Sequence, residues 1–325
     1  MRRAAPLLVG AALLLLLPLG AIEPRAWLTL TVAGLAMGML IFLVASGLTL
    51  IFGLMDVLNF AHGALFSWGA YAGFTLAVAL DARRGWAAAP SVGLNALLLL
   101  LAVAAAVAVS FVLGVLLERV IVRPVYGQHL FQILITLGAT IVLEEVIRVA
   151  WGPNDQVMPV PATFQGSWDV ADVVVLRFPA IAIGLGVLVY GAVQWLLTRT
   201  RVGLIVRAGV ENREMVQVMG HDIHRYFTAV FAAGSGLAGL GGLMWGMFGQ
   251  SIRPSMGGEQ LIFALIVVII GGLGSVTGSL VGALLVGLAY NYVAFLVPKA
   301  AIGVTMGIMV LVLLVRPTGL YGAGK

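Results

Sequence analysis

Long runs of apolar residues alternate along the chain with short clusters of charged ones. One helical crossing of a hydrocarbon core about 30 Å thick needs roughly 20 apolar residues. Since lipid offers no partner to backbone polar groups, each run must be helical or hidden inside protein. The pattern therefore predicts a polytopic helical bundle. The windows of 16 residues or more without Asp, Glu, Lys or Arg are 4–22, 26–55, 57–80, 85–117, 124–143, 178–198, 226–252, 260–298 and 300–315.

The window 260–298 holds 39 residues, which is too long for one crossing. The stretch 271–275, with three glycines, interrupts it near the middle, so we expect two helices there. Barrel strands would alternate polar and apolar positions, whereas these runs are continuous. We therefore predict an all-α fold of about ten helices (eight to ten), some of them discontinuous. The expected helices cover 6–22, 27–53, 59–80, 91–117, 129–150, 178–198, 226–249, 259–272, 278–297 and 300–316.

The first apolar run has two interpretations. Arg2 and Arg3 precede the run 7–17, an arrangement that also resembles a secretory signal peptide. Leu19 stands where a cleavage site needs a small residue. We expect residues 1–25 to form an extra, uncleaved membrane helix, with a cleaved signal-like segment as the alternative.

The composition supports a membrane protein and excludes several other classes. Of the 325 residues, 62% are hydrophobic and 10% are charged, and the mean hydropathy is +1.11, far from the composition of a soluble domain. The net charge of +5 is spread over short islands, which argues against nucleic-acid binding. The chain has no cysteine, which excludes disulfides, thiolate catalysis and cysteine-bound metals. We expect no metal site and no cofactor.

The distribution of Lys and Arg between alternate loops sets the expected orientation. With the first residues inside, eleven of the 18 fall on the cytoplasmic side and seven on the other. The densest group, five arginines in the loop 199–225, is therefore expected in the cytoplasm. The longest segment on the outer side, 151–177, is expected to be an irregular or lid-like connection.

The predicted cytoplasmic loop carries the most informative polar sequence. We predict a helix over 206–219 with Gly220 as its C-terminal stop. An ordinary solvated loop is the alternative. The charged residues that favour an amphipathic helix outside the bilayer recur at three- to four-residue spacing and are Arg207, Glu211 and Glu214.

Part of this loop resembles a known transport motif. The segment 214–220 is similar to the E-A-A-x-x-x-G loop of ABC-importer membrane subunits, which inserts into a cleft of a cytoplasmic ATPase. Met215 and Val216 stand in place of the two alanines. Residues 208–220, which begin A-x-x-E-N, resemble the same loop in branched-chain amino acid (LIV-type) permeases. The residues that this resemblance assigns to ATPase coupling are Glu211, Asn212, Glu214 and Gly220.

Other stretches resemble the same permease family, in the expected order along most of the chain. The sequence SGLTLIFG at 46–53 leads into NFAHG at 59–63, similar to the family's amino-terminal signature. GGLGSVTG at 271–278 resembles its G-G-x-G-S-x-x-G break, and RPTGL at 316–320 resembles its carboxyl-terminal ending.

The resemblance implies the transmembrane subunit of an ATP-driven importer, with residues 26–321 as its permease domain and 1–25 as an extension that short family members lack. The chain has no G-x-x-x-x-G-K-[ST] sequence, so ATP hydrolysis is expected on partner ATPase subunits. The other implied partners are a second homologous permease subunit, an extracytoplasmic solute-binding protein and membrane lipid, with no nucleic acid. The implied location is the cytoplasmic (inner) membrane of a bacterium or archaeon.

The resemblance implies leucine, isoleucine and valine as substrates, but permeases of this type also serve urea, short amides and other small amphipathic solutes. No residue discriminates among them. The alternative function is a stand-alone secondary transporter or channel, which would carry ionisable residues in mid-helix, and almost none occur here. An integral-membrane enzyme would need clustered catalytic groups, so we expect no enzymatic activity.

Two broken apolar segments carry the residues that we expect along the translocation path. Asn59 and His62 begin one run, and unpaired polar groups at membrane depth must face protein or a water-filled path. Both side chains have a structural alternative, which is to cap a helix or bond to freed backbone groups. In the second break, glycine lets backbone segments approach closely. The residues assigned to the path are Asn59, His62, Gly63, Gly271, Gly272, Gly274 and Ser275.

Overall fold

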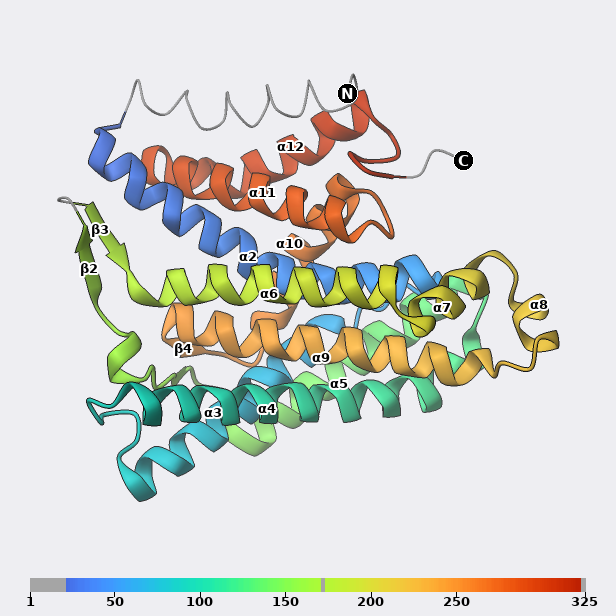
Figure 1. The fold of residues 1–325 in the computed structure, drawn as a ribbon, viewed down its shortest axis with the longest axis horizontal. Coiled ribbons are helices and arrows are strands. Elements are labelled where there is room, and N and C mark those ends of the chain that lie inside the picture. Colours follow the sequence, from blue (N-terminus) through green and yellow to red (C-terminus); the bar gives the residue numbers. More distant parts are fainter. Residues whose placement is uncertain (1–21, 171–172, 323–325) are drawn as a thin grey trace.

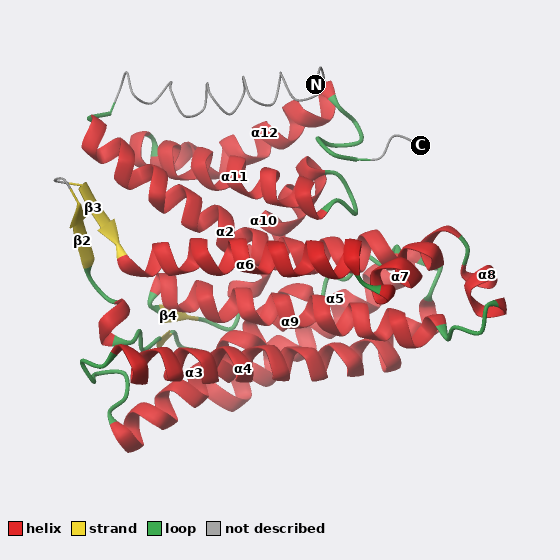
Figure 2. Ribbon diagram, in the orientation of Figure 1, coloured by secondary structure: helices red, strands yellow, loops and turns green. Residues whose placement is uncertain are grey.

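The computed structural model describes residues 22–170 and 173–322. These residues form a bundle of roughly aligned helices (Figure 1) with few strands (Figure 2). The longer helices are α2 (Pro24–Met55), α3 (His62–Arg84), α4 (Val92–Leu117), α5 (His129–Trp151), α6 (Arg177–Arg199), α9 (Ile223–Gly249), α10 (Met256–Gly271), α11 (Val276–Leu296) and α12 (Ala301–Val315). Two shorter helices, α7 (Arg201–Glu211) and α8 (Arg213–Val218), follow α6.

The predicted helices from 27–53 onward are all present, within about four residues of their expected bounds. Except for Ile22, the expected helix at 6–22 lies outside the described residues. Eight described helices are long and apolar enough to cross a membrane, and α10 is a shorter apolar helix. The prediction of an all-α, polytopic bundle is therefore confirmed.

The bundle has two distinct ends. Figure 1 places α7 and α8 at one end, which we call the α7–α8 end, and the hairpin of β2 (Ser167–Val170) and β3 (Val173–Leu176) at the other, which we call the β2–β3 end. Nearby, β1 (Gln156–Val157) pairs with β4 (Ser251–Ile252). The connection over 151–177, expected to be irregular or lid-like, therefore contains short strands that were not predicted. The run of valines in β3 favours a strand, and the partner of β1 is remote in sequence.

Helix α2 is the centre of the bundle. Nearly all of its residues from Gly34 to Ile51 are buried, and it contacts α9, α10, α11 and α6. Helices α4, α5, α6 and α12 instead expose large apolar side chains along much of their length. These outer faces are suited to lipid. Examples are Leu100, Ile141, Leu188 and Leu314.

Small residues bring the central helices into close contact. Gly34 and Gly38 of α2 lie against the backbone of α11 around Gly287. Gly69 of α3 lies against Gly239 of α9, where an added Cβ would overlap the α9 backbone. This arrangement is the small-residue packing that membrane helices use when backbones approach each other.

Three irregular segments interrupt the helices within the bundle: 56–61, 250–255 and 272–275. The first and third were expected. The second was not predicted as a break, because it is only the gap between the expected helices 226–249 and 259–272. It folds back along the bundle, so that the Gly257 N–H at the start of α10 donates to the Ser67 hydroxyl of α3 (3.1 Å).

Candidate functional site

Asn212 divides the predicted coupling helix into two. The structure has α7 up to Glu211, an extended Asn212 (φ −151°, ψ 98°), and then α8. The Asn212 side-chain oxygen accepts a hydrogen bond from the Met215 N–H (2.9 Å), so it caps α8. The expectation of one continuous helix over 206–219 was wrong, because Asn prefers the N-cap position, where its side chain satisfies a free backbone N–H.

Gly220 ends α8 in a left-handed conformation (φ +85°). The Gly220 N–H donates to Gln217 O (2.9 Å) and the His221 N–H donates to Val216 O (3.2 Å). Glycine adopts positive φ at no steric cost, so the predicted C-terminal stop lies where it was expected. Asp222 then caps α9 by accepting from the His224 N–H (3.1 Å).

The unit formed by α7 and α8 is anchored on one side and exposed on the other. Val206 and Val216 are buried, and Gly209 lies directly against Ile223 at the start of α9. By contrast, α8 exposes large apolar side chains at its tip. Such a surface is typical of a contact with another protein. The exposed residues are Met215 (57%), Val218 (83%) and Met219 (70%).

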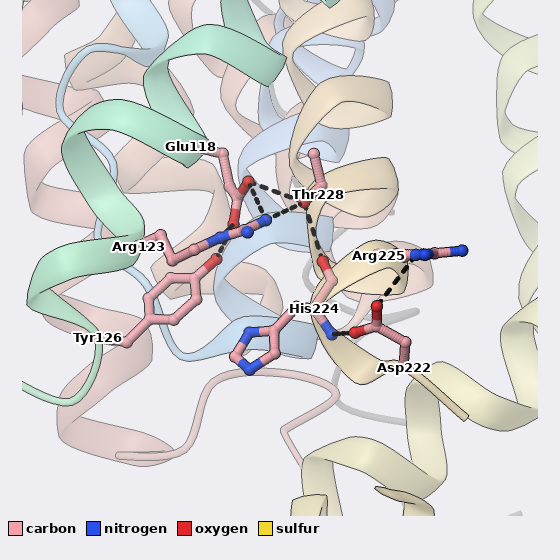
Figure 3. A network of polar contacts seen from close by, with 7 residues as sticks. All are labelled: Glu118, Arg123, Tyr126, Asp222, His224, Arg225 and Thr228. Carbon is pink, nitrogen blue, oxygen red and sulfur yellow. Dashed lines mark hydrogen bonds and ion pairs between the residues drawn. The ribbon is translucent and has the colours of Figure 1, made fainter. Parts of the chain in front are cut away.

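A buried carboxylate lies beside the first turns of α9 (Figure 3). Glu118, in the π-helical turn Glu118–Val122 that follows α4, is fully buried. Arg123 donates to both of its oxygens (3.1 and 3.0 Å), Tyr126 donates to Oε1 (2.6 Å) and Thr228 of α9 donates to Oε2 (2.8 Å). Four hydrogen bonds therefore satisfy the buried charge.

This cluster, Glu118 with Arg123, Tyr126 and Thr228, ties the end of α4 to the first turns of α9. Figure 3 shows that Asp222, His224 and Arg225, at the start of α9, lie beside it. Because only residues 219–222 separate α8 from α9, a displacement of α8 would reach the cluster through this turn and about two turns of α9. This cluster was not predicted from the sequence. The only sequence signal is an acidic residue at the end of an apolar window with an arginine five positions later.

The candidate path residues at the α2–α3 break lie deep in the bundle. The His62 ring Nε2 is 3.0 Å from Val44 O, and Val44 lies eleven residues, or about 16 Å of helix rise, before the end of α2. Gly63 lies directly against Gly257 of α10. The buried Asn59 carboxamide has no hydrogen-bond partner for its oxygen or its nitrogen within the described residues.

The glycines of the α10–α11 break allow backbone conformations and close contacts that other residues would not. Gly272 and Gly274 have φ of +97° and +83°, and Gly271 lies against Gly278. The Ser275 hydroxyl accepts from the Gly278 N–H (3.1 Å) and caps α11. The chain after α12 returns to this break, where Tyr321 N donates to Gly271 O (2.9 Å).

The two groups of candidate path residues are not brought together. Gly274 lies against Gly53, near the end of α2. His62 and Gly63 instead begin α3, deeper in the bundle, beside the start of α10. One break is thus at the α7–α8 end and the other is in the interior.

A family model described as the permease component of branched-chain amino acid transport systems matches residues 30–314. The chain is 30% identical over 296 residues to the high-affinity branched-chain amino acid transport system permease protein BraD of Pseudomonas aeruginosa, covering 90% of this chain and 94% of that protein. It is 27% identical to permease protein LivH of Escherichia coli K12, covering 89% and 93%. It is also 27% identical to the probable LivH of Methanocaldococcus jannaschii, covering 87% and 89%. No solved structure matches the chain at a significant level.

Proposed function

Since the chain belongs to the family of permease components of branched-chain amino acid transport systems, we propose that it is the transmembrane subunit of an importer driven by partner ATPases. Leucine, isoleucine, valine or related small amphipathic solutes are the proposed cargo. The chain is a multi-pass protein of the cytoplasmic membrane. The observation that carries the proposed mechanism is the capped, exposed helix α8 at one end of the bundle.

In this proposal the α7–α8 end faces the cytoplasm and α8 inserts into a cleft of an ATPase subunit. Asn212 and Gly220 hold α8 at its two ends, and its exposed apolar tip supplies the contact. Glu211 and Glu214 belong to the same contact. A solute-binding protein delivers cargo at the β2–β3 end, and a second permease subunit completes the assembly. Residues 26–321 are the permease domain, and residues 1–25 are an extension to it.

Motion of the ATPase reaches the membrane through α9. The start of α9 lies against α7 at Gly209, and Thr228 binds the buried Glu118 carboxylate at the end of α4 (2.8 Å). Because Glu118 is satisfied by groups from both segments, α4 and α9 move together at this end. A shift of α8 would therefore displace both α4 and α9 within the membrane.

The proposed path follows the α2–α3 break. The unpaired Asn59 carboxamide is a buried polar group with a donor and an acceptor available at membrane depth, as expected where water or solute passes. His62 and Gly63 border it. Gly271, Gly272, Gly274 and Ser275 act at the other break by letting α10 and α11 change their relative angle.

Uptake of labelled leucine into proteoliposomes tests this function. The complete importer, with this chain, its permease partner, both ATPases and the binding protein, should import leucine only when ATP and the ATPases are present. Uptake that persists without the ATPases and follows an ion gradient would contradict the proposal and favour a stand-alone secondary transporter.

A further inference from the structure

A cavity of about 480 Å³ lies in the half of the bundle toward the β2–β3 end. Small-molecule sites in proteins occupy roughly 300–1,000 Å³, so the space suits a small solute. It reaches from Gly249, the last residue of α9, to Met37, thirteen residues into α2. Its apolar wall comes from five helices, α2, α9, α10, α11 and α12. The main apolar residues are Met37, Trp245, Ile262, Phe263, Tyr290 and Met306.

One charged pair lines this apolar cavity. Arg253 Nη2 and Glu259 Oε2 are 2.6 Å apart, and their side chains are 48% and 53% exposed. Arg253 lies in the segment that folds back between α9 and α10, and Glu259 lies in the first turn of α10. Ionisable groups at membrane depth are costly and mark functional sites by default.

The folded-back segment places this half-exposed pair at the wall of the cavity. The Ser67 hydroxyl of α3 donates to Pro254 O (3.1 Å) and accepts from Gly257 N (3.1 Å). These bonds fix the backbone between Arg253 and Glu259 against α3. An ordinary connection at the end of the bundle would instead place both charges away from the cavity.

We propose that this cavity binds a zwitterionic amino acid, with its carboxylate on Arg253, its ammonium on Glu259 and its side chain on the apolar wall. The contact between the two residues occupies one guanidinium nitrogen and one carboxylate oxygen. The other guanidinium N–H groups can donate to a ligand carboxylate, and Glu259 Oε1 can accept from a ligand ammonium. An amino acid carries both of these groups on its α-carbon. Guanidinium and carboxylate also match each other as planar, two-point partners.

The inference rests on the proposed function and narrows its cargo. Urea and short amides carry no charge, so they can form hydrogen bonds with Arg253 and Glu259 but no ion pair with either residue. A branched apolar amino acid uses both parts of the cavity, the charged pair and the apolar wall.

The absence of cysteine gives a direct test of binding. Ile262→Cys places one thiol in the cavity wall, where Ile262 is 52% exposed. In the complete importer, saturating leucine should slow labelling of this thiol by a small water-soluble reagent by about tenfold, as mass action gives at a concentration roughly ten times Kd. Leucinamide, N-acetyl-leucine and urea, each lacking one or both charges, should protect far less. Met306→Cys is a second reporter on α12.

Removing either charge should weaken the protection. Arg253→Gln and Glu259→Gln, each combined with the reporter, should raise the leucine concentration needed by roughly 10- to 100-fold, because each loses a charge-assisted hydrogen bond. The matched control is the pair Arg148 and Glu145 on α5, which is similarly exposed (43% and 59%) and does not line the cavity. Glu145→Gln should leave protection unchanged.

Three outcomes would overturn the site. Leucine that is imported but protects neither reporter would exclude it, and so would equal protection by the charge-blocked analogues. A thiol that reacts in the isolated chain but not in the assembled importer would show that a second permease subunit covers the cavity. Loss of ATP-driven leucine uptake by the wild-type importer would instead count against the proposed function.

Discussion

At the residue scale, the cap at Asn212 gives the sharpest test of the α8 geometry. Asn212→Ala removes the side-chain acceptor for the Met215 N–H, which should destabilise α8 by about 1 kcal/mol. ATP-driven uptake, normalised to the amount of protein in the membrane, should fall. Asn212→Ser, which keeps an acceptor oxygen, should retain most of it. Equal uptake in both variants would show that the cap does not matter for coupling.

The buried Glu118 carboxylate should matter for stability more than any exposed ion pair. Glu118→Ala removes the buried acceptor that Arg123, Tyr126 and Thr228 share, and losing the partner of a buried hydrogen-bonding group costs roughly 1–3 kcal/mol. Thermal unfolding of the purified chain in detergent should show a clear loss of stability. Glu145→Ala, in an exposed pair on α5, should cost less than about 1 kcal/mol. Equal losses of stability in the two variants would contradict the view that the cluster holds α4 and α9 together.

Local residue chemistry could be predicted from the sequence, and long-range partners could not. The stop at Gly220 followed from the need for positive φ at a helix end. Asn212 was chosen through a family resemblance, but its role as a cap that splits the helix was not foreseen. The bond between Glu118 and Thr228 joins residues 110 positions apart, and no local pattern indicates it.

At the element scale, the α10–α11 break should tolerate no side chain at Gly272. Its φ is +97°, and an added Cβ would meet the backbone at Gly322 and Thr318. Gly272→Leu should therefore lower uptake by more than it lowers the amount of inserted protein, because non-glycine residues pay about 1–3 kcal/mol in such conformations.

The matched control lies on a membrane-facing helix. Gly184 of α6 is exposed and has open space where a Cβ would stand, so Gly184→Leu should leave normalised uptake unchanged. Wild-type uptake in Gly272→Leu would show that this break is not needed for transport.

Helices were predictable because each needs only a long charge-free window, a local property of the sequence. The fold of the segment between α9 and α10 was not predictable, since Arg253 and Glu259 only mark the borders of two charge-free windows. Its true position depends on hydrogen bonds to Ser67 of α3. Charged residues that line a cavity and charged residues in an ordinary loop give the same sequence pattern.

At the scale of the whole molecule, the structure separates the residues that the sequence grouped as one path. Asn59 and His62 lie deep in the bundle, whereas the glycine break begins beside the end of α2 at Gly53. Sequence signatures identify which segments are special but not how far apart they lie. The depth of each break follows only from how α2, α3 and α10 pack.

The proposed transport mechanism depends most on a cytoplasmic α8 that contacts an ATPase. Gln217 is exposed on α8, and Gln217→Cys gives this cysteine-free chain a single thiol. In intact cells that thiol should be shielded from a membrane-impermeant reagent. In the purified complete importer it should be protected by the bound ATPase and cross-link to it. Labelling from outside intact cells, or equal labelling with and without the ATPase, would contradict the account.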